Sequence, residues 1–220
     1  AESALEKAIK IIRNANPDII LLQEIQRNSV MSARLDQVEL LIQLLPKSYS
    51  NYSCAYYLKS SFNPSPSYWG PTDQMLCTFS KYKISDSIRI ALPSRLNTNF
   101  LIQQFHPKRA LLITTLPINH KPPLTIINTH FSAFAQHTNT LQQQAKITYQ
   151  ILSKLQRHNK PAILSGDLNL LGHPSLRKHV SIHDQKYYAE KKTALSPYFL
   201  KFNSFPNLSQ LRGTNKKNFY

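Results

Sequence analysis

The sequence predicts an α/β or α+β sandwich, because segments typical of buried strands are mixed with amphipathic helical segments along its 220 residues. Hydrophobic residues make up 41% of the chain, which is enough to bury the core of one domain. No internal repeat and no boundary between domains is recognisable. We therefore expect residues 1–220 to form a single domain.

The first 45 residues predict a helix, a strand and a second helix. Apolar residues recur at helical spacing over residues 1–14, and Pro17 ends this predicted helix. Residues 18–24 form a short apolar run closed by polar residues, which is typical of a strand buried on both faces. Helical spacing returns over residues 35–45, so we expect a second helix there.

The middle of the chain predicts short strands, because it is rich in β-branched and aromatic residues separated by Pro, Asn and Ser. These predicted strands cover residues 53–58, 73–79, 84–91 and 109–116. Residues 59–72 contain three prolines and predict a long exposed loop.

A predicted strand over residues 124–130, a helix over 138–158 and a strand over 161–166 follow. Beyond residue 176 the pattern weakens, which indicates either loops or an incomplete element.

The formal net charge is +16, and it is unevenly distributed. Residues 1–45 hold five basic and six acidic side chains, 5 − 6 = −1, so the remainder holds 22 − 5 = +17. A field of this sign attracts polyanions such as nucleic acid, anionic phospholipid or an inositol phosphate. A solvated basic surface explains the charge equally well, so charge alone identifies no partner.

No apolar run approaches the roughly 20 residues that span a bilayer, so the sequence predicts a soluble chain without a transmembrane segment. A targeting segment would lie before Ala1, and the compartment stays open. Cys54 and Cys77 are the only cysteines. They are far apart in sequence and lack the spacing of a metal site, so we expect buried thiols rather than a disulfide.

Polar residues that could do chemistry follow three of the predicted strands, where ligand sites of α/β sheets gather. Glu24 ends the first strand and is a candidate ligand for Mg2+, which takes one or two carboxylates together with waters and phosphate oxygens. An ordinary solvated strand end is the alternative. His130 ends the second strand and could donate a hydrogen bond to a phosphoryl oxygen, or could be a core histidine with protein partners.

The third strand ends in Gly166-Asp167-Leu168-Asn169. The glycine allows a sharp turn, after which Asp167 and Asn169 can face one pocket. Asp167 could orient or deprotonate a water, and Asn169 could bind a phosphate oxygen without repelling it. The alternative is an Asx turn that caps the strand. Glycine-rich phosphate loops, nucleophile elbows and zinc-binding patterns are absent from the sequence.

Taken in order, five blocks resemble those of the endonuclease/exonuclease/phosphatase superfamily. They are residues 16–24 (NPDIILLQE), 73–84 (DQMLCTFSKYKI), 108–112 (KRALL), 125–131 (TIINTHF) and 161–169 (PAILSGDLN). No single block is decisive, but the family order is kept from Ala4 to Leu171. The resemblance implies a four-layer sandwich, in which two mostly antiparallel sheets lie between helices.

The resemblance also implies a metal-dependent hydrolase of phosphate esters, either a phosphodiesterase such as a nuclease or a phosphatase, acting by in-line attack of water. Glu24 would hold the divalent metal, usually Mg2+ with Mn2+ as the alternative. Asp167 would orient or activate the water, Asn169 would contact the scissile phosphate, and His130 would stabilise the developing charge. Arg109 and Asn128 would assist substrate binding.

Two family blocks have no counterpart in this sequence. The opening strand with its Asn would precede Ala1, and the closing Asp and Asp-His pair would follow Tyr220. We therefore expect a chain truncated at both ends, with weak or no activity alone. A catalytically inactive polyanion-binding module on the same fold is the alternative. Metal dependence separates the two, because polyanion binding by a basic surface survives chelation and weakens with salt.

Overall fold

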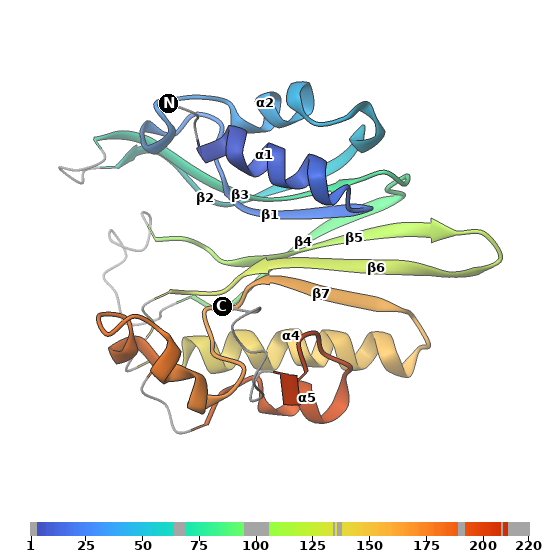
Figure 1. The fold of residues 1–220 in the computed structure, drawn as a ribbon, viewed down its shortest axis with the longest axis vertical. Coiled ribbons are helices and arrows are strands. Elements are labelled where there is room, and N and C mark those ends of the chain that lie inside the picture. Colours follow the sequence, from blue (N-terminus) through green and yellow to red (C-terminus); the bar gives the residue numbers. More distant parts are fainter. Residues whose placement is uncertain are drawn as a thin grey trace.

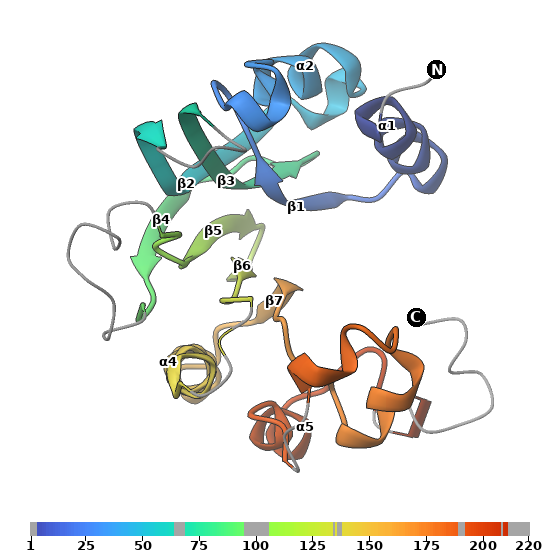
Figure 2. The ribbon, with the colours of Figure 1, turned by 90° about the vertical axis from the view of Figure 1, so that its left-hand side faces the viewer.

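The computed structural model describes residues 4–63, 69–94, 106–133, 135, 138–188, 192–207 and 209–210. Within them, two β-sheets lie face to face between two layers of helices (Figures 1 and 2). The predicted four-layer sandwich is therefore confirmed. All strand pairs are antiparallel except the last, between β6 and β7.

The first sheet has the order β1-β3-β2 and the second the order β4-β5-β6-β7. The strands of the first sheet are β1 (Ile19–Ile25), β2 (Asn51–Asn63) and β3 (Gly70–Ser80). Those of the second are β4 (Asp86–Ala91), β5 (Ala110–Ile118), β6 (Lys121–His130) and β7 (Ala162–Asp167).

Helices cover the outer face of each sheet (Figure 1). The first sheet carries α1 (Ala4–Ala15) and α2 (Gln37–Leu44), and the second carries α4 (Thr140–Arg157) and α5 (Ser196–Lys201). Short 3-10 helices cover Val30–Ser32, Lys47–Tyr49, Pro174–His179 and Gln185–Tyr188. None of these helices is long and apolar enough to cross a membrane.

Three buried clusters correspond to the three interfaces between the layers. Ile9 of α1 and Leu41 of α2 pack with Phe79 on the first sheet. Ala145 of α4 packs with Ile127 on the second sheet. The cluster between the sheets is small and consists of Tyr57, Leu76, Ala110 and Leu112. Burial of these apolar side chains holds the four layers together.

The predicted loop over residues 59–72 is wrong at both ends. Residues 59–63 continue β2 and residues 70–72 belong to β3, where Asn63 pairs with Gly70. Pairing between the strands overrides the local turn tendency of the prolines. Residues 64–68 lie outside the described part of the chain.

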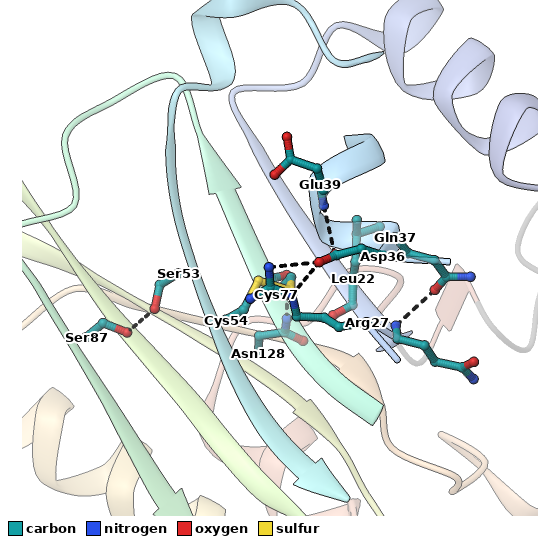
Figure 3. The surroundings of a disulfide bond; sticks show 11 residues. Leu22, Arg27, Asp36, Gln37, Glu39, Ser53, Cys54, Cys77, Ser87 and Asn128 are labelled. Carbon is teal, nitrogen blue, oxygen red and sulfur yellow. Dashed lines mark hydrogen bonds and ion pairs between the residues drawn. A yellow bond between two sulfur atoms is a disulfide. The ribbon is translucent and has the colours of Figure 1, made fainter. Parts of the chain in front are cut away.

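The prediction of two free thiols is also wrong, because Cys54 and Cys77 form a disulfide (Figure 3). The two residues are 23 apart in sequence but directly opposite each other in the β2–β3 pair, with their Cα atoms 4.2 Å apart. Sequence spacing does not reveal this register, which the hairpin alone sets.

Candidate active site

The topology brings the ends of four strands to one edge of the sandwich. Because β6 and β7 are parallel, His130 and Asp167 both lie at this edge, and they are paired in register. Strand β5 runs antiparallel to β6, so Arg109, which directly precedes it, lies there too. The C-terminal end of β1 brings Glu24 beside His130. This edge is at the left of Figure 1, opposite the β5–β6 hairpin.

Glu24 is placed by an irregularity in β1. The β1–β3 register shifts between Leu22 and Ile25, and Glu24 adopts a positive φ of 61° inside this bulge. Bulges of this kind redirect a side chain and are frequent beside active sites. The Glu24 side chain is 58% exposed, so its carboxylate is accessible from solvent.

His130 lies between two carboxylates and a tyrosine. Its Nδ1 atom is 3.9 Å from Glu24 Oε1 and 3.3 Å from the Tyr57 hydroxyl, and its Nε2 atom is 3.6 Å from Asp167 Oδ2. The pKa of His130 is lowered to about 4, mainly by burial and also by the nearby positive charge of Arg109, while Asp167 opposes the shift. The imidazole is therefore neutral at pH 7 and can both donate and accept a hydrogen bond.

Arg109 is the buried cation of the site. Its guanidinium lies 4.9 Å from the centroid of the Tyr57 ring, and the residue is only 7% exposed. Burial lowers its pKa, because the charged form has lost solvation. Its Nη1 atom is buried without a hydrogen-bond partner among the described residues. An unpartnered buried donor on a cation is costly, so this position favours an anionic ligand.

Asp167 and Asn169 form the turn that follows β7. The Asn169 backbone N–H donates to Asp167 Oδ1 (2.9 Å), and the Asn169 side-chain amide donates to the Phe131 carbonyl (2.9 Å). The predicted Asx-type turn is thus present, and it fixes Asp167 with its Oδ2 atom toward His130. The two interpretations of this motif are compatible, because the turn positions the carboxylate.

Gly166 is required at this turn. Its φ is +139°, and a Cβ atom there would lie 2.0 Å from the Thr129 carbonyl oxygen. Only glycine allows β7 to approach β6 this closely just before Asp167.

Asn128 is completely buried and connects the two sheets. Its amide nitrogen donates to the carbonyl oxygens of Leu22 (3.1 Å) and Cys77 (3.0 Å), and its Oδ1 atom accepts from the Gln23 side chain (2.8 Å). Figure 3 shows Asn128 beside the disulfide and Leu22. Because these partners are all protein atoms, we assign Asn128 a positioning role, and a contact with substrate stays a prediction.

Tyr57 joins the site although nothing in the sequence pointed to it. It lies on β2, and its ring packs edge-on against His130 (5.7 Å between centroids) as well as against Arg109. Burial raises the pKa of its hydroxyl, so the phenol stays protonated. An aromatic residue in a strand has no sequence signal that separates such a role from ordinary packing.

The acidic residues fit a hard cation that keeps most of its other ligands from water and substrate. The described residues contain no group of three or more His, Cys, Asp or Glu side chains that could by itself hold a metal ion. Mg2+ needs fewer, usually one or two carboxylates. Glu24, the carboxylate predicted to bind the metal, is 58% exposed at this edge, and Asp167, 52% exposed, contacts the other ring nitrogen of His130.

Known structures share this architecture at low sequence identity. An endonuclease/exonuclease/phosphatase from Beutenbergia cavernae has 20% identity and a TM-score of 0.58, over 76% of this chain and 42% of that one. The human Nocturnin catalytic domain, with bound sulfate, has 18% identity and a TM-score of 0.55, over 95% and 66%. ANGEL2, a 2',3'-cyclic phosphatase, has 17% identity and a TM-score of 0.51, over 90% and 54%.

The chain thus spans less than two thirds of the length of each of these structures. No curated protein is significantly similar to it in sequence. The profile of the Endonuclease/Exonuclease/phosphatase family matches residues 3–210, which is most of the chain. The resemblance carried by the five sequence blocks is confirmed, and the chain belongs to the Endonuclease/Exonuclease/phosphatase family.

Proposed function

We propose that residues 1–220 are a single domain of a divalent-metal-dependent hydrolase of phosphate esters. The observation that supports this most is the buried Arg109, whose Nη1 atom has no protein partner within the described chain, next to His130. A phosphoryl group has the charge and the acceptor oxygens that this donor requires. The carboxylates of Glu24 and Asp167 flank the same place.

In the proposed reaction, Arg109 binds a non-bridging oxygen of the phosphate and its charge stabilises the charge that builds up there. Asp167 orients a water molecule for in-line attack on phosphorus and accepts its proton. The water oxygen forms the new bond to phosphorus as the bond to the leaving oxygen breaks.

His130 is neutral in this arrangement, so it acts as a hydrogen-bond donor to a phosphoryl oxygen rather than as a second cation. Tyr57 holds the imidazole and the guanidinium in place. Asn169 keeps Asp167 in position through its backbone N–H. One N–H of its side-chain amide donates to the Phe131 carbonyl, and the proposed contact with a phosphate oxygen uses the second N–H of the same Nδ2 atom.

Glu24 would hold Mg2+ or Mn2+ together with water and phosphate oxygens. Such an ion, when bound, neutralises phosphate charge and polarises the P–O bonds. One of the three structures with this architecture is a 2',3'-cyclic phosphatase, and its reaction is of the proposed class.

The test is hydrolysis of bis(p-nitrophenyl) phosphate by the complete protein that contains this chain, in Mg2+, in Mn2+ and in EDTA. We expect activity only with metal, and a loss of roughly 100-fold or more in Glu24→Gln, His130→Gln and Asp167→Asn. The matched control is Asp18→Asn, which changes an exposed carboxylate at the opposite end of β1. It should retain the rate of the unmodified protein.

Equal rates with metal and with EDTA would refute the proposal, and so would full activity in the Glu24 and Asp167 variants. Absence of hydrolysis together with polyanion binding that survives EDTA would instead support the inactive binding module.

A further inference from the structure

The β2–β3 hairpin projects beyond the edge that carries the candidate active site (Figure 1). Strand β1 ends at Ile25, opposite Met75 of β3, whereas the β2–β3 pair continues to Asn63 and Gly70. The five further residues of β3 correspond to about 17 Å of extended chain. Strands β1 and β2 both run antiparallel to β3, so this projection lies on the same side as Glu24.

Two aromatic side chains are displayed on this projection. Phe62 and Trp69 pack edge to face, with ring centroids 4.9 Å apart, and both are exposed, Trp69 by 68%. An exposed aromatic pair offers ring faces on which a nucleic-acid base can stack. The neighbouring residues Ser60, Ser61 and Asn63 are polar, which favours a base over a bilayer as the partner of the two rings.

A basic pocket of about 200 Å3 lies at the base of the hairpin, where β2 meets the second sheet. Its lining residues are Tyr56, Tyr57, Leu58, Lys59, Arg89, His106 and Lys108. Three of them are permanent cations, and none of the described residues that line it is acidic. Such a set attracts an anion.

Hydrogen bonds to the backbone hold the pocket in shape. The Arg89 guanidinium donates to the carbonyl oxygens of Tyr56 (2.7 Å) and Lys108 (2.9 Å). These bonds link β4 to β2 and to the segment that precedes β5. Lys59 lies over the Tyr56 ring, with its Nζ atom 4.9 Å from the centroid. Lys59 and Lys108 are exposed residues, so a ligand can reach their ammonium groups.

The pocket adjoins the candidate active site. Tyr57 lines the pocket and also contacts Arg109 and His130, and Lys108 directly precedes Arg109. An anion in the pocket and a phosphate on Arg109 would therefore both lie near Tyr57. This arrangement suits a ligand with more than one phosphate.

We propose that the pocket and the hairpin form a subsite for single-stranded nucleic acid. A phosphate flanking the scissile one binds in the pocket between Lys59 and Lys108, and a base stacks on the Phe62–Trp69 pair. The inference rests on the proposed function, because it takes Arg109 as the position of the scissile phosphate. Aromatic stacking next to a cationic groove is how sequence-tolerant single-strand binding is built.

The test measures binding of a fluorescein-labelled oligothymidylate to the 220-residue chain in EDTA, so that no hydrolysis occurs. We expect Lys59→Gln/Lys108→Gln to weaken binding about tenfold or more. It should also reduce the slope of log K against log[salt] by about 0.7, for the one phosphate contact that is lost. The matched control, Lys121→Gln/Lys160→Gln, removes the same charge from exposed residues at the opposite end of the sandwich and should change the affinity much less.

Trp69 provides an independent readout, because it is the only tryptophan of the 220-residue chain. Unlabelled oligothymidylate should quench its fluorescence, and Trp69→Ala should weaken binding of the labelled strand about fivefold or more, the loss expected for one stacked base. Equal effects of the pocket and control variants would overturn the subsite, as would Trp69 quenching by phosphatidylserine vesicles but not by the oligonucleotide. Because binding is measured without metal, the subsite and the catalytic proposal fail independently.

Discussion

The pH dependence of stability tests the electrostatics of the candidate site most directly, through His130. Its pKa is about 4 in the folded chain, first because the imidazole is buried and then because Arg109 lies close, against an ordinary value of 6.5. The groups that face it are Glu24, Asp167, Arg109 and Tyr57. Between these two pKa values the unfolded chain binds a proton at this histidine and the folded chain does not.

The sign of the effect follows from this difference. Because the folded-state pKa is depressed, stabilisation by the neutral imidazole is fully present above pH 6.5 and is lost as the pH falls toward 4. Between pH 7.5 and pH 5, a shift from 6.5 to about 4 reduces the free energy of unfolding by about 2 kcal/mol. At pH 5 most of the loss of unfolding free energy that His130 causes has occurred, and the imidazole of the folded chain is still mostly neutral.

The assay is urea unfolding of the chain and of His130→Gln at pH 7.5 and pH 5, in EDTA. The variant lacks the titrating group, so the difference in unfolding free energy between the two proteins isolates His130 from the other ionisable groups. We expect this difference to fall by about 2 kcal/mol on going to pH 5. A difference that is the same at both pH values would show that His130 keeps an ordinary pKa, and the role of a neutral donor would then be wrong.

Three further variants test the framework of the site by urea unfolding. Gly166→Ala should destabilise the chain by about 2 kcal/mol or more, because the backbone there has a positive φ and the new Cβ would collide with Thr129; an unchanged midpoint would contradict the close approach of β7 to β6. Replacing Cys54 and Cys77 by alanine should cost about 3 kcal/mol, and dithiothreitol should destabilise only the unmodified chain. Asn128→Asp should cost about 3 kcal/mol, since a carboxylate cannot donate to the two carbonyl groups that the amide now bonds; a neutral effect would argue against the inter-sheet role.

Several features of this protein are readable from the sequence because they are local. The apolar run before Glu24 specifies a strand, and the glycine before Asp167 specifies the turn that follows another. Strand direction then places polar residues at the ends of buried strands, where they can converge. The five ordered blocks were also sufficient to identify the family.

Other features depend on contacts between residues that are distant in the chain, and only the tertiary structure decided them. The disulfide exists because the β2–β3 register places Cys54 opposite Cys77, and the same pairing turns a predicted loop into a projecting hairpin. Tyr57 enters the site because the two sheets pack face to face and leave its ring between Arg109 and His130. Register and sheet packing are cooperative properties of the whole fold, so no local pattern encodes them.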